Sequence, residues 1–237
     1  MKKTTFTISM LLCLVAMCFT SCKTNEPDAF DQRWITSYQN VTIGSHNFAG
    51  GNFLYLKTGK TVKLNAVTAE NQKNLALFYP ATNINGYICF PANADDPFDG
   101  AGGTPNTSLF TQNPQGVNHW NASGKTGGKI QITKTLTIQE FADLASLRDP
   151  KNFDALYRAN NNNTGKEFIS GLTYTLNPKS GQTYLLDFNG LIRAIMWVKN
   201  ASIGAGGSIT FDLIVESRES YNRFDQTKHL QPDDPEK

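Results

Sequence analysis

The segment from residue 182 to residue 216 constrains the fold most, because it predicts three consecutive antiparallel strands. Residues 182–188 are apolar and aromatic, Asn189-Gly190 follows, and residues 191–198 are again mainly apolar. Asn-Gly accepts the two positive φ angles of a type I′ turn, so these two runs form a β-hairpin. In residues 207–216 every second side chain is apolar, which predicts a third strand. Together the three strands form an antiparallel meander.

Shorter strands are predicted earlier in the chain. Residues 52–57 and 129–133 alternate between the two faces of a strand, the latter through Ile130 and Ile132. Two apolar runs, residues 75–79 and 87–90, flank a turn sequence of the Asn-Ile-Asn-Gly type, which is a spacing typical of a hairpin.

Two short helices are expected between the strands. Thr137 and Glu140 have the spacing of a capping box, in which each side chain satisfies a backbone N–H of the other residue. Asp149 followed by Pro150 predicts the start of a second helix. A third helical turn is expected over residues 66–72. The predicted fold class is therefore α+β and β-dominated, with antiparallel sheets arranged as a sandwich or a meander, two or three short helices and long loops.

The N-terminus has the features of a bacterial lipoprotein signal. Lys2 and Lys3 precede an apolar run from Ile8 to Phe19, and small residues then precede Cys22. The apolar run is shorter than the roughly 20 residues that a spanning helix needs. Acylation of Cys22 would make it the new N-terminus and would attach the chain to a membrane. We therefore predict an exported protein, anchored by lipid in the cell envelope and most simply in the outer membrane, on either face.

Removal of the signal also changes the charge of the chain. The full sequence has 22 basic and 20 acidic residues, and loss of Lys2 and Lys3 leaves 20 of each. A neutral chain without a basic block argues against a nucleic-acid partner. Cys89 is the one cysteine left after Cys22, so no internal disulfide is expected, and its apolar neighbours predict a buried thiol.

These features predict the domain organisation. Residues 1–21 are the signal peptide and residues 22–33 are a lipidated polar tether. Residues 34–217 form a single β-rich domain, or alternatively two halves at about 34–100 and 129–217. Residues 218–237 are a polar tail.

The loop of residues 92–128 is the expected location of a binding site, since long loops are often functional or mobile. His119 lies beside Trp120 in this loop, and an imidazole next to an indole could ligate or stack on a flat ligand. The alternative is a surface histidine on a loop.

Three carboxylates in the same loop are weak candidates for calcium. Asp95, Asp96 and Asp99 are clustered as hard cations require, but Pro97 occupies a position where an EF-hand loop needs a ligand. A solvated turn rich in aspartate is the other interpretation. No Gly-x-Ser-x-Gly motif or pair of closely spaced histidines occurs, so an enzyme is the least supported class.

Two resemblances follow from the sequence. The signal, Cys22 and the polar tether are similar to those of exported lipoproteins of the Bacteroidetes type. A second pattern comprises residues 141–144, 154–157, 171–172, 183–195 and 207–211 and resembles uncharacterised lipoproteins of that group. It ends in a strand, an Asn-Gly turn, a strand and then Gly-x-Ile-Thr-Phe, and this ending also resembles haem-binding HmuY-type lipoproteins. The HmuY resemblance implies capture of haem between two axial side chains, and no pair of residues is assigned to that role.

The function predicted from the sequence is that of a lipid-anchored, non-enzymatic binding or accessory protein with an unknown ligand. A glycan or a small molecule is the expected partner, besides the membrane that holds the anchor. The alternatives are a hydrolase that acts on glycans through two facing carboxylates and a structural subunit of a surface assembly. No cofactor is assigned, although haem and calcium stay open.

Overall fold

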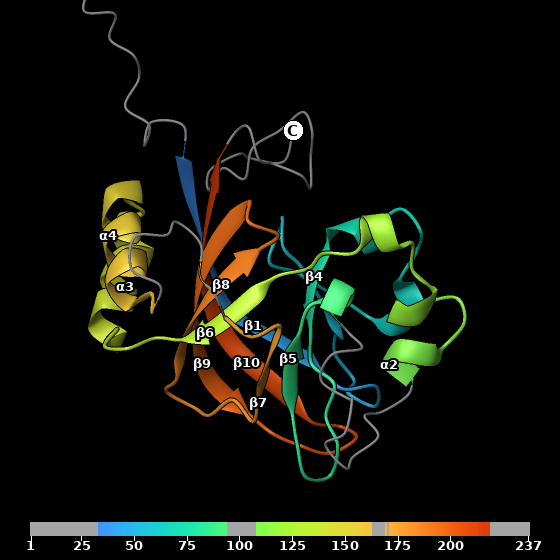
Figure 1. The fold of residues 1–237 in the computed structure, drawn as a ribbon. Coiled ribbons are helices and arrows are strands. Elements are labelled where there is room, and N and C mark those ends of the chain that lie inside the picture. Colours follow the sequence, from blue (N-terminus) through green and yellow to red (C-terminus); the bar gives the residue numbers. More distant parts are fainter. Residues whose placement is uncertain (1–32, 94–107, 163–168, 170, 219–237) are drawn as a thin grey trace, which may run out of the picture. The chain divides into compact units, whose positions relative to one another are not determined.

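The computed structural model describes residues 33–93, 108–162, 169 and 171–218, which belong to one compact unit that begins at Arg33. They form two five-stranded sheets in which every pair of strands is antiparallel (Figure 1). Sheet A has the order β1 (Arg33–Gly44), β10 (Ser208–Arg218), β9 (Ile192–Ala201), β8 (Thr183–Phe188) and β6 (Lys129–Ile132). Sheet B has the order β3 (Thr61–Val62), β2 (Phe53–Tyr55), β4 (Leu75–Phe78), β5 (Tyr87–Cys89) and β7 (Tyr174–Leu176). The predicted β-dominated α+β class is confirmed.

Each sheet contains one strand that is distant in sequence from the other strands of that sheet. The first strand, β1, pairs with the last strand, β10, from Arg33 opposite Arg218 to Gly44 opposite Ser208. Conversely, β7 lies between β6 and β8 in the sequence, but it pairs with β5 in sheet B. Neither sheet is therefore built from one continuous half of the sequence.

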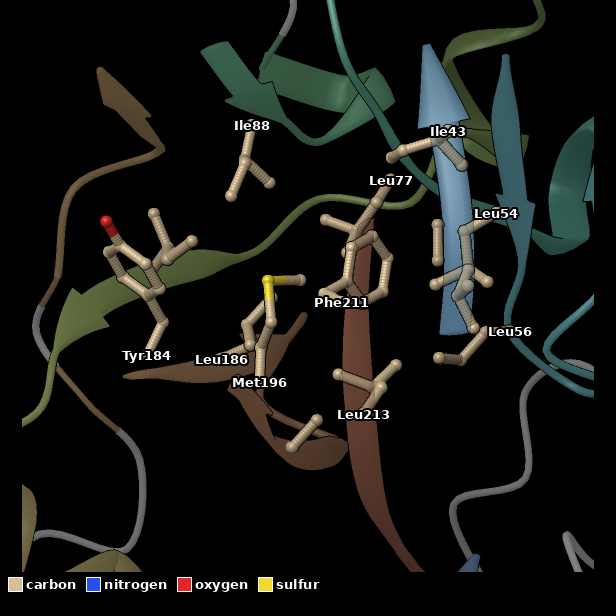
Figure 2. Packing of buried hydrophobic residues seen from close by; sticks show 14 of the residues in the cluster. Ile43, Leu54, Leu56, Leu77, Ile88, Tyr184, Leu186, Met196, Phe211 and Leu213 are labelled. Carbon is tan, nitrogen blue, oxygen red and sulfur yellow. The ribbon is translucent and has the colours of Figure 1, made fainter. Parts of the chain in front are cut away.

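The main core lies between the sheets, where apolar side chains from both inner faces meet (Figure 2). Alternate residues of one strand point to the same face, so β10 contributes four fully buried side chains to this core: Ile209, Phe211, Leu213 and Val215. Sheet B supplies opposing side chains, among them Leu54, Leu77 and Ile88, and Leu56 follows directly after β2. The predicted third strand and its apolar face are confirmed.

Helices cover the outer faces of both sheets. On sheet A, α3 (Ile138–Leu147) and α4 (Pro150–Asn160) pack over Leu185, Ile195 and Ile214. On sheet B, a second cluster includes residues of α2 (Ser108–Thr111) and of several one-turn 3₁₀ helices. The turns that contribute to it are η1 (Leu64–Ala66), through Leu64, and η5 (Val117–His119), through Val117. Further one-turn 3₁₀ helices are η2 (Gln72–Asn74), η3 (Pro91–Asn93) and η6 (Ala122–Gly124). The thiol of Cys89 is buried in the same cluster, as predicted.

The two helix-capping signals in the sequence are found where they were expected. The Thr137 hydroxyl accepts from the Glu140 N–H while the Glu140 carboxylate accepts from the Thr137 N–H, which confirms the capping box of α3. Asp149 caps α4 through the Lys151 N–H. The helical turn predicted over residues 66–72 is formed only in part, as two separate turns at the ends of that range.

Extended backbone at Val67 divides this segment into two turns, η1 before it and η2 after it. Asn71 Oδ1 accepts from the Thr68 N–H at 2.9 Å, and Thr68 Oγ1 accepts from the Asn71 N–H at 3.2 Å. These reciprocal bonds have the pattern of a capping box. They start a single helical turn, in which the Thr68 carbonyl accepts from the Gln72 N–H at 3.0 Å, and this turn continues into η2.

The Asn189-Gly190 turn gives a prediction about stability. Both residues have positive φ, 54° and 70° respectively, as a type I′ turn requires. Gly190→Ala should lower the free energy of unfolding by about 1 kcal/mol, because an L side chain is strained in this region. Gly206→Ala is the matched control, since a Cβ there meets open space and its φ is not left-handed. Equal stabilities of the two variants in urea unfolding would contradict this account of the turn.

Candidate functional site

The candidate site lies where an edge of sheet A meets an edge of sheet B. The edge strand β6 of sheet A is joined to the segment before β7 by two backbone hydrogen bonds between Ile130 and Leu172, at 2.8 and 3.1 Å. The other side of β6 pairs with β8, and β7 pairs with β5. The Ile130–Leu172 bridge therefore links the two sheets at this edge of the sandwich.

An open groove of about 690 Å³ lies at this seam. We call it the seam groove, and it is lined by Ile130, Gln131, Ile132, Asn162, Gly171, Leu172, Tyr174, Thr175, Leu176, Asn177, Lys179, Gln182 and Tyr184. A volume between about 300 and 1,000 Å³ is typical of pockets for small molecules. The seam groove is thus large enough for such a ligand.

Three large apolar side chains in the seam groove are exposed. Leu172 is 67% exposed, Ile132 is 50% exposed and Leu176 is 49% exposed, and they are three of the seven exposed large apolar residues in the described part of the chain. Ile132 lies on the same face of β6 as the buried Ile130, two residues earlier. The core between the sheets is therefore open to solvent at this point.

The polar wall of the seam groove is held in place by hydrogen bonds. Gln182 Oε1 accepts from the Tyr184 hydroxyl at 2.5 Å and from the Lys179 backbone N–H at 2.7 Å. The Asn177 side chain accepts from the Gly86 N–H and donates to Asn85. Burial raises the pKa of Tyr184, which a hydrogen bond with Thr175 partly offsets, so the phenol stays protonated at neutral pH. None of the thirteen described lining residues is a carboxylate, a histidine or a cysteine.

A second polar cluster crosses the outer face of sheet A. Lys129, Asp187, Arg193 and Glu216 are direct cross-strand neighbours on β6, β8, β9 and β10, so their charges alternate in sign along one row. Oppositely charged neighbours of this kind stabilise a sheet. Arg193 is almost fully buried, and its Nε donates to Glu216 Oε2 at 2.6 Å.

Helix α4 completes this charged row. Asp154 accepts hydrogen bonds from Arg193 Nη1 at 2.8 Å and from Arg158 Nε at 2.7 Å. Burial opposes ionisation of Asp154, but the hydrogen bonds and charges of the two arginines lower its pKa. The rings of Tyr157 and Phe153 lie 4.9 and 5.4 Å from the Arg193 guanidinium, within the range of cation–π attraction. The cluster thus fixes α4 on the sheet.

The structure places His119 and Trp120 in different surroundings. Trp120 is a core residue: its ring packs 5.1 Å from the ring of Phe53, and its indole N–H donates to the Gln115 carbonyl at 2.7 Å. The His119 side chain is exposed, with Nε2 at 3.0 Å from the Thr111 carbonyl. The geometry does not bring them together as a ligand platform, and neither residue lines the seam groove. Their role in binding stays a prediction.

The other predicted site residues, Cys22, Asp95, Asp96 and Asp99, lie outside the described residues. Within the described part of the chain, no group of three or more histidine, cysteine, aspartate or glutamate side chains is arranged to hold a metal ion. No helix in that part is long and apolar enough to cross a membrane.

The seam groove also fits haem poorly. Haem iron is most often held by histidine, cysteine or methionine, and tyrosine is a rarer ligand. The described lining residues offer only the phenols of Tyr174 and Tyr184, and the Tyr184 hydroxyl already donates to Gln182. His46, two residues after the end of β1, does not line the groove either. We derive no role for haem at this site.

The residues of the seam groove were not identified from the sequence. Ile132 was expected to alternate with Ile130 as an ordinary strand residue, and nothing in the sequence indicates that its face is uncovered. One sequence signal for the groove is available. The short strand with Ile130 and Ile132 is followed, about 40 residues later, by a mainly polar segment that contains the isolated Leu172 and Leu176. This signal becomes informative only once the pairing of residues 130 and 172 is known.

Comparisons with known proteins give little further information. No family model and no curated protein matches the chain. One solved structure that the chain is similar to is that of a DUF4466 family protein from Parabacteroides merdae, at 13% identity and a TM-score of 0.49. The match covers 78% of this chain and 54% of that chain, so it spans about half of that protein's length. We carry over no property of that protein, and the lipoprotein and HmuY-type resemblances stay predictions.

Asp187 in the charged row gives a prediction about pH. Burial raises its pKa to about 6, although the Gly190 N–H and the charges of Arg193 and Lys129 favour ionisation. Because this folded-state pKa lies above the unfolded value near 4, the folded state binds the proton more tightly. The contribution of Asp187 to stability therefore falls as pH rises from about 4 to about 6.

Asp187→Asn retains a carbonyl oxygen for the Gly190 N–H, which bonds Asp187 Oδ1 at 2.7 Å, and removes the titration. The stability of this variant relative to the parent should rise by about 2 kcal/mol between pH 4 and pH 7, as measured by urea unfolding. Asp143→Asn, on the exposed surface of α3, controls for the loss of a carboxylate. A difference between Asp187→Asn and the parent that is independent of pH would contradict the assignment.

Proposed function

We propose that this protein is a lipid-anchored, non-enzymatic binding protein of the bacterial cell envelope, with the seam groove as its ligand site. The single observation that carries the binding role is the open groove of about 690 Å³ with three exposed apolar side chains. Contiguous apolar surface in a concave site is expensive to leave in water and is typical of a binding site. A small molecule with an apolar portion is the partner that this surface favours.

The anchor is supported by the N-terminal sequence. Lys2 and Lys3, the short apolar run from Ile8 to Phe19 and the following Cys22 have the order of a lipoprotein signal. The compact unit begins at Arg33, which leaves a polar tether between Cys22 and the folded domain. Such a tether would keep the domain close to the membrane surface without inserting it.

The chemistry of the described side chains favours binding over the hydrolase alternative. A glycoside hydrolase needs two carboxyl groups that face each other across a substrate cleft. The seam groove has no carboxylate among its described lining residues. The buried carboxylates of Asp154 and Glu216 are instead hydrogen-bonded to arginines on the outer face of sheet A. They are thereby held in a structural role.

The anchor is tested by metabolic labelling with palmitate in the native host or a related bacterium. The full chain should be labelled, and Cys22→Ser should be unlabelled and released from the membrane fraction, because the acylated sulfur is then absent. Cys89→Ser is the matched control and should retain the label, since that thiol is buried within the fold. Membrane association of Cys22→Ser equal to that of the parent would refute the anchor.

The binding site is tested by native mass spectrometry of the folded protein purified from its own membrane. We expect a bound small molecule that is retained by the parent and lost from Leu172→Ser, because that change removes exposed apolar surface from the groove. Ile84→Ser removes a residue of similar exposure, 64%, in the turn between β4 and β5 outside the groove and should retain the molecule. The site is refuted if Leu172→Ser retains the same molecule to the same extent as the parent.

A further inference from the structure

The seam groove combines its apolar surface with a charge of one sign. Lys179 is the one charged side chain among its thirteen described lining residues. Lys179 is exposed, and no described acidic residue forms an ion pair with its ammonium group. The described lining of the groove therefore carries one positive charge and no negative charge, and a ligand with a negative charge would complement it.

The hydrogen bonds of the polar wall point to the same chemistry. The Gln182 carbonyl oxygen is already occupied by the Tyr184 hydroxyl and the Lys179 N–H. Its amide NH₂ group makes no hydrogen bond with the described residues, so it is a free donor. Lys179 Nζ is a second donor on the same wall. Two free donors favour an acceptor with more than one oxygen, such as a carboxylate.

The apolar part of the ligand is defined by the exposed aliphatic side chains of the groove. These are Ile132 of β6, Leu176 of β7 and Leu172 in the segment before β7. Such side chains fit an alkyl chain, which gains about 0.8 kcal/mol for each CH₂ group that it buries. An alkyl chain in this position would continue the core, which is open at Ile132.

We propose that the seam groove binds a single-chain amphiphile with a carboxylate head, the head paired with Lys179 and the alkyl chain packed on Ile132, Leu172 and Leu176. The inference rests on the proposed function, because it names the ligand class of the same groove. It assigns Lys179 a role in specificity, and the three aliphatic side chains supply affinity for the chain. The same contacts would discriminate against a neutral ester of equal length, which cannot pair with the ammonium group.

Isothermal titration calorimetry tests this inference at pH 8, with dodecanoate below its micellar concentration and its methyl ester below its solubility limit as probes. The protein is the full mature chain with the Cys22→Ser change. Dodecanoate should bind more tightly than the ester. Lys179→Gln should weaken dodecanoate about fivefold, as expected for one exposed ion pair, and should leave the ester unchanged. Leu172→Ser should weaken both probes about tenfold.

Two control variants separate specific from general effects. Lys73→Gln removes an exposed lysine outside the groove, and Ile84→Ser removes an exposed isoleucine outside it; neither should change the affinity for either probe. Circular dichroism and urea unfolding of every variant check that the fold is intact.

The outcomes distinguish this inference from the proposed function. If both probes bind equally and both are weakened by Leu172→Ser, the groove is a binding site but the carboxylate assignment is wrong. If neither probe binds, the amphiphile class is refuted, and the native ligand retained by the purified protein still decides whether the groove is a binding site. A loss of dodecanoate binding in Lys73→Gln equal to that in Lys179→Gln would show general charge attraction and would also overturn the assignment.

Discussion

The buried guanidinium of Arg193 is the constraint on which the arrangement of this domain depends. Arg193 is 1% exposed, and an unpaired charge at such a position would cost several kcal/mol. Its partners come from distant parts of the sequence, Glu216 on β10 and Asp154 on α4. Arg33 at the start of β1 donates to Glu216 as well. The first strand, the last strand and a helix are thereby fixed around one side chain.

This network makes the two faces of sheet A different in kind. The inner face is apolar, so a shift of one strand along its neighbour would be opposed there only by lost packing. The outer face carries a pattern of charges that specifies the strand register. A shift of β9 by one residue would move Arg193 into the apolar core and would place Ala194 opposite Glu216. The alternating charges therefore select one register for β8, β9 and β10. Buried ion pairs add little net stability, so their contribution here is better described as specificity.

Those parts of the fold that depend on local chemistry could be predicted from the sequence. The Asn189-Gly190 turn, the capping box of Thr137 and Glu140 and the apolar face of β10 are each determined by residues close together in the chain. The seam groove could not be predicted, because it depends on the pairing of Ile130 with Leu172 across 42 positions. Alternation along β6 places Ile132 on the inner face with Ile130. The sequence does not show that this face is uncovered at Ile132, because that depends on where the other sheet lies. Trp120 shows the same dependence on tertiary contacts, since nothing in its local sequence indicates that its ring packs against Phe53.

The same topology separates the part of the domain that maintains the fold from the part that we propose binds a ligand. The charged row occupies the outer face of sheet A beneath α4, and the main core lies between the two sheets. The seam groove lies at the edges of both sheets, where β6 and β7 each have one side without a continuous strand partner. Its exposed side chains bury little area and therefore contribute little to the stability of the fold. Substitutions there can change the ligand that is bound, while Arg193 and the inner faces of the sheets maintain the fold. The bridge between Ile130 and Leu172 orders the backbone at this edge, and the apolar side chains beside it stay accessible to solvent. A rigid scaffold with an open seam is thus a physical basis for binding without large conformational change.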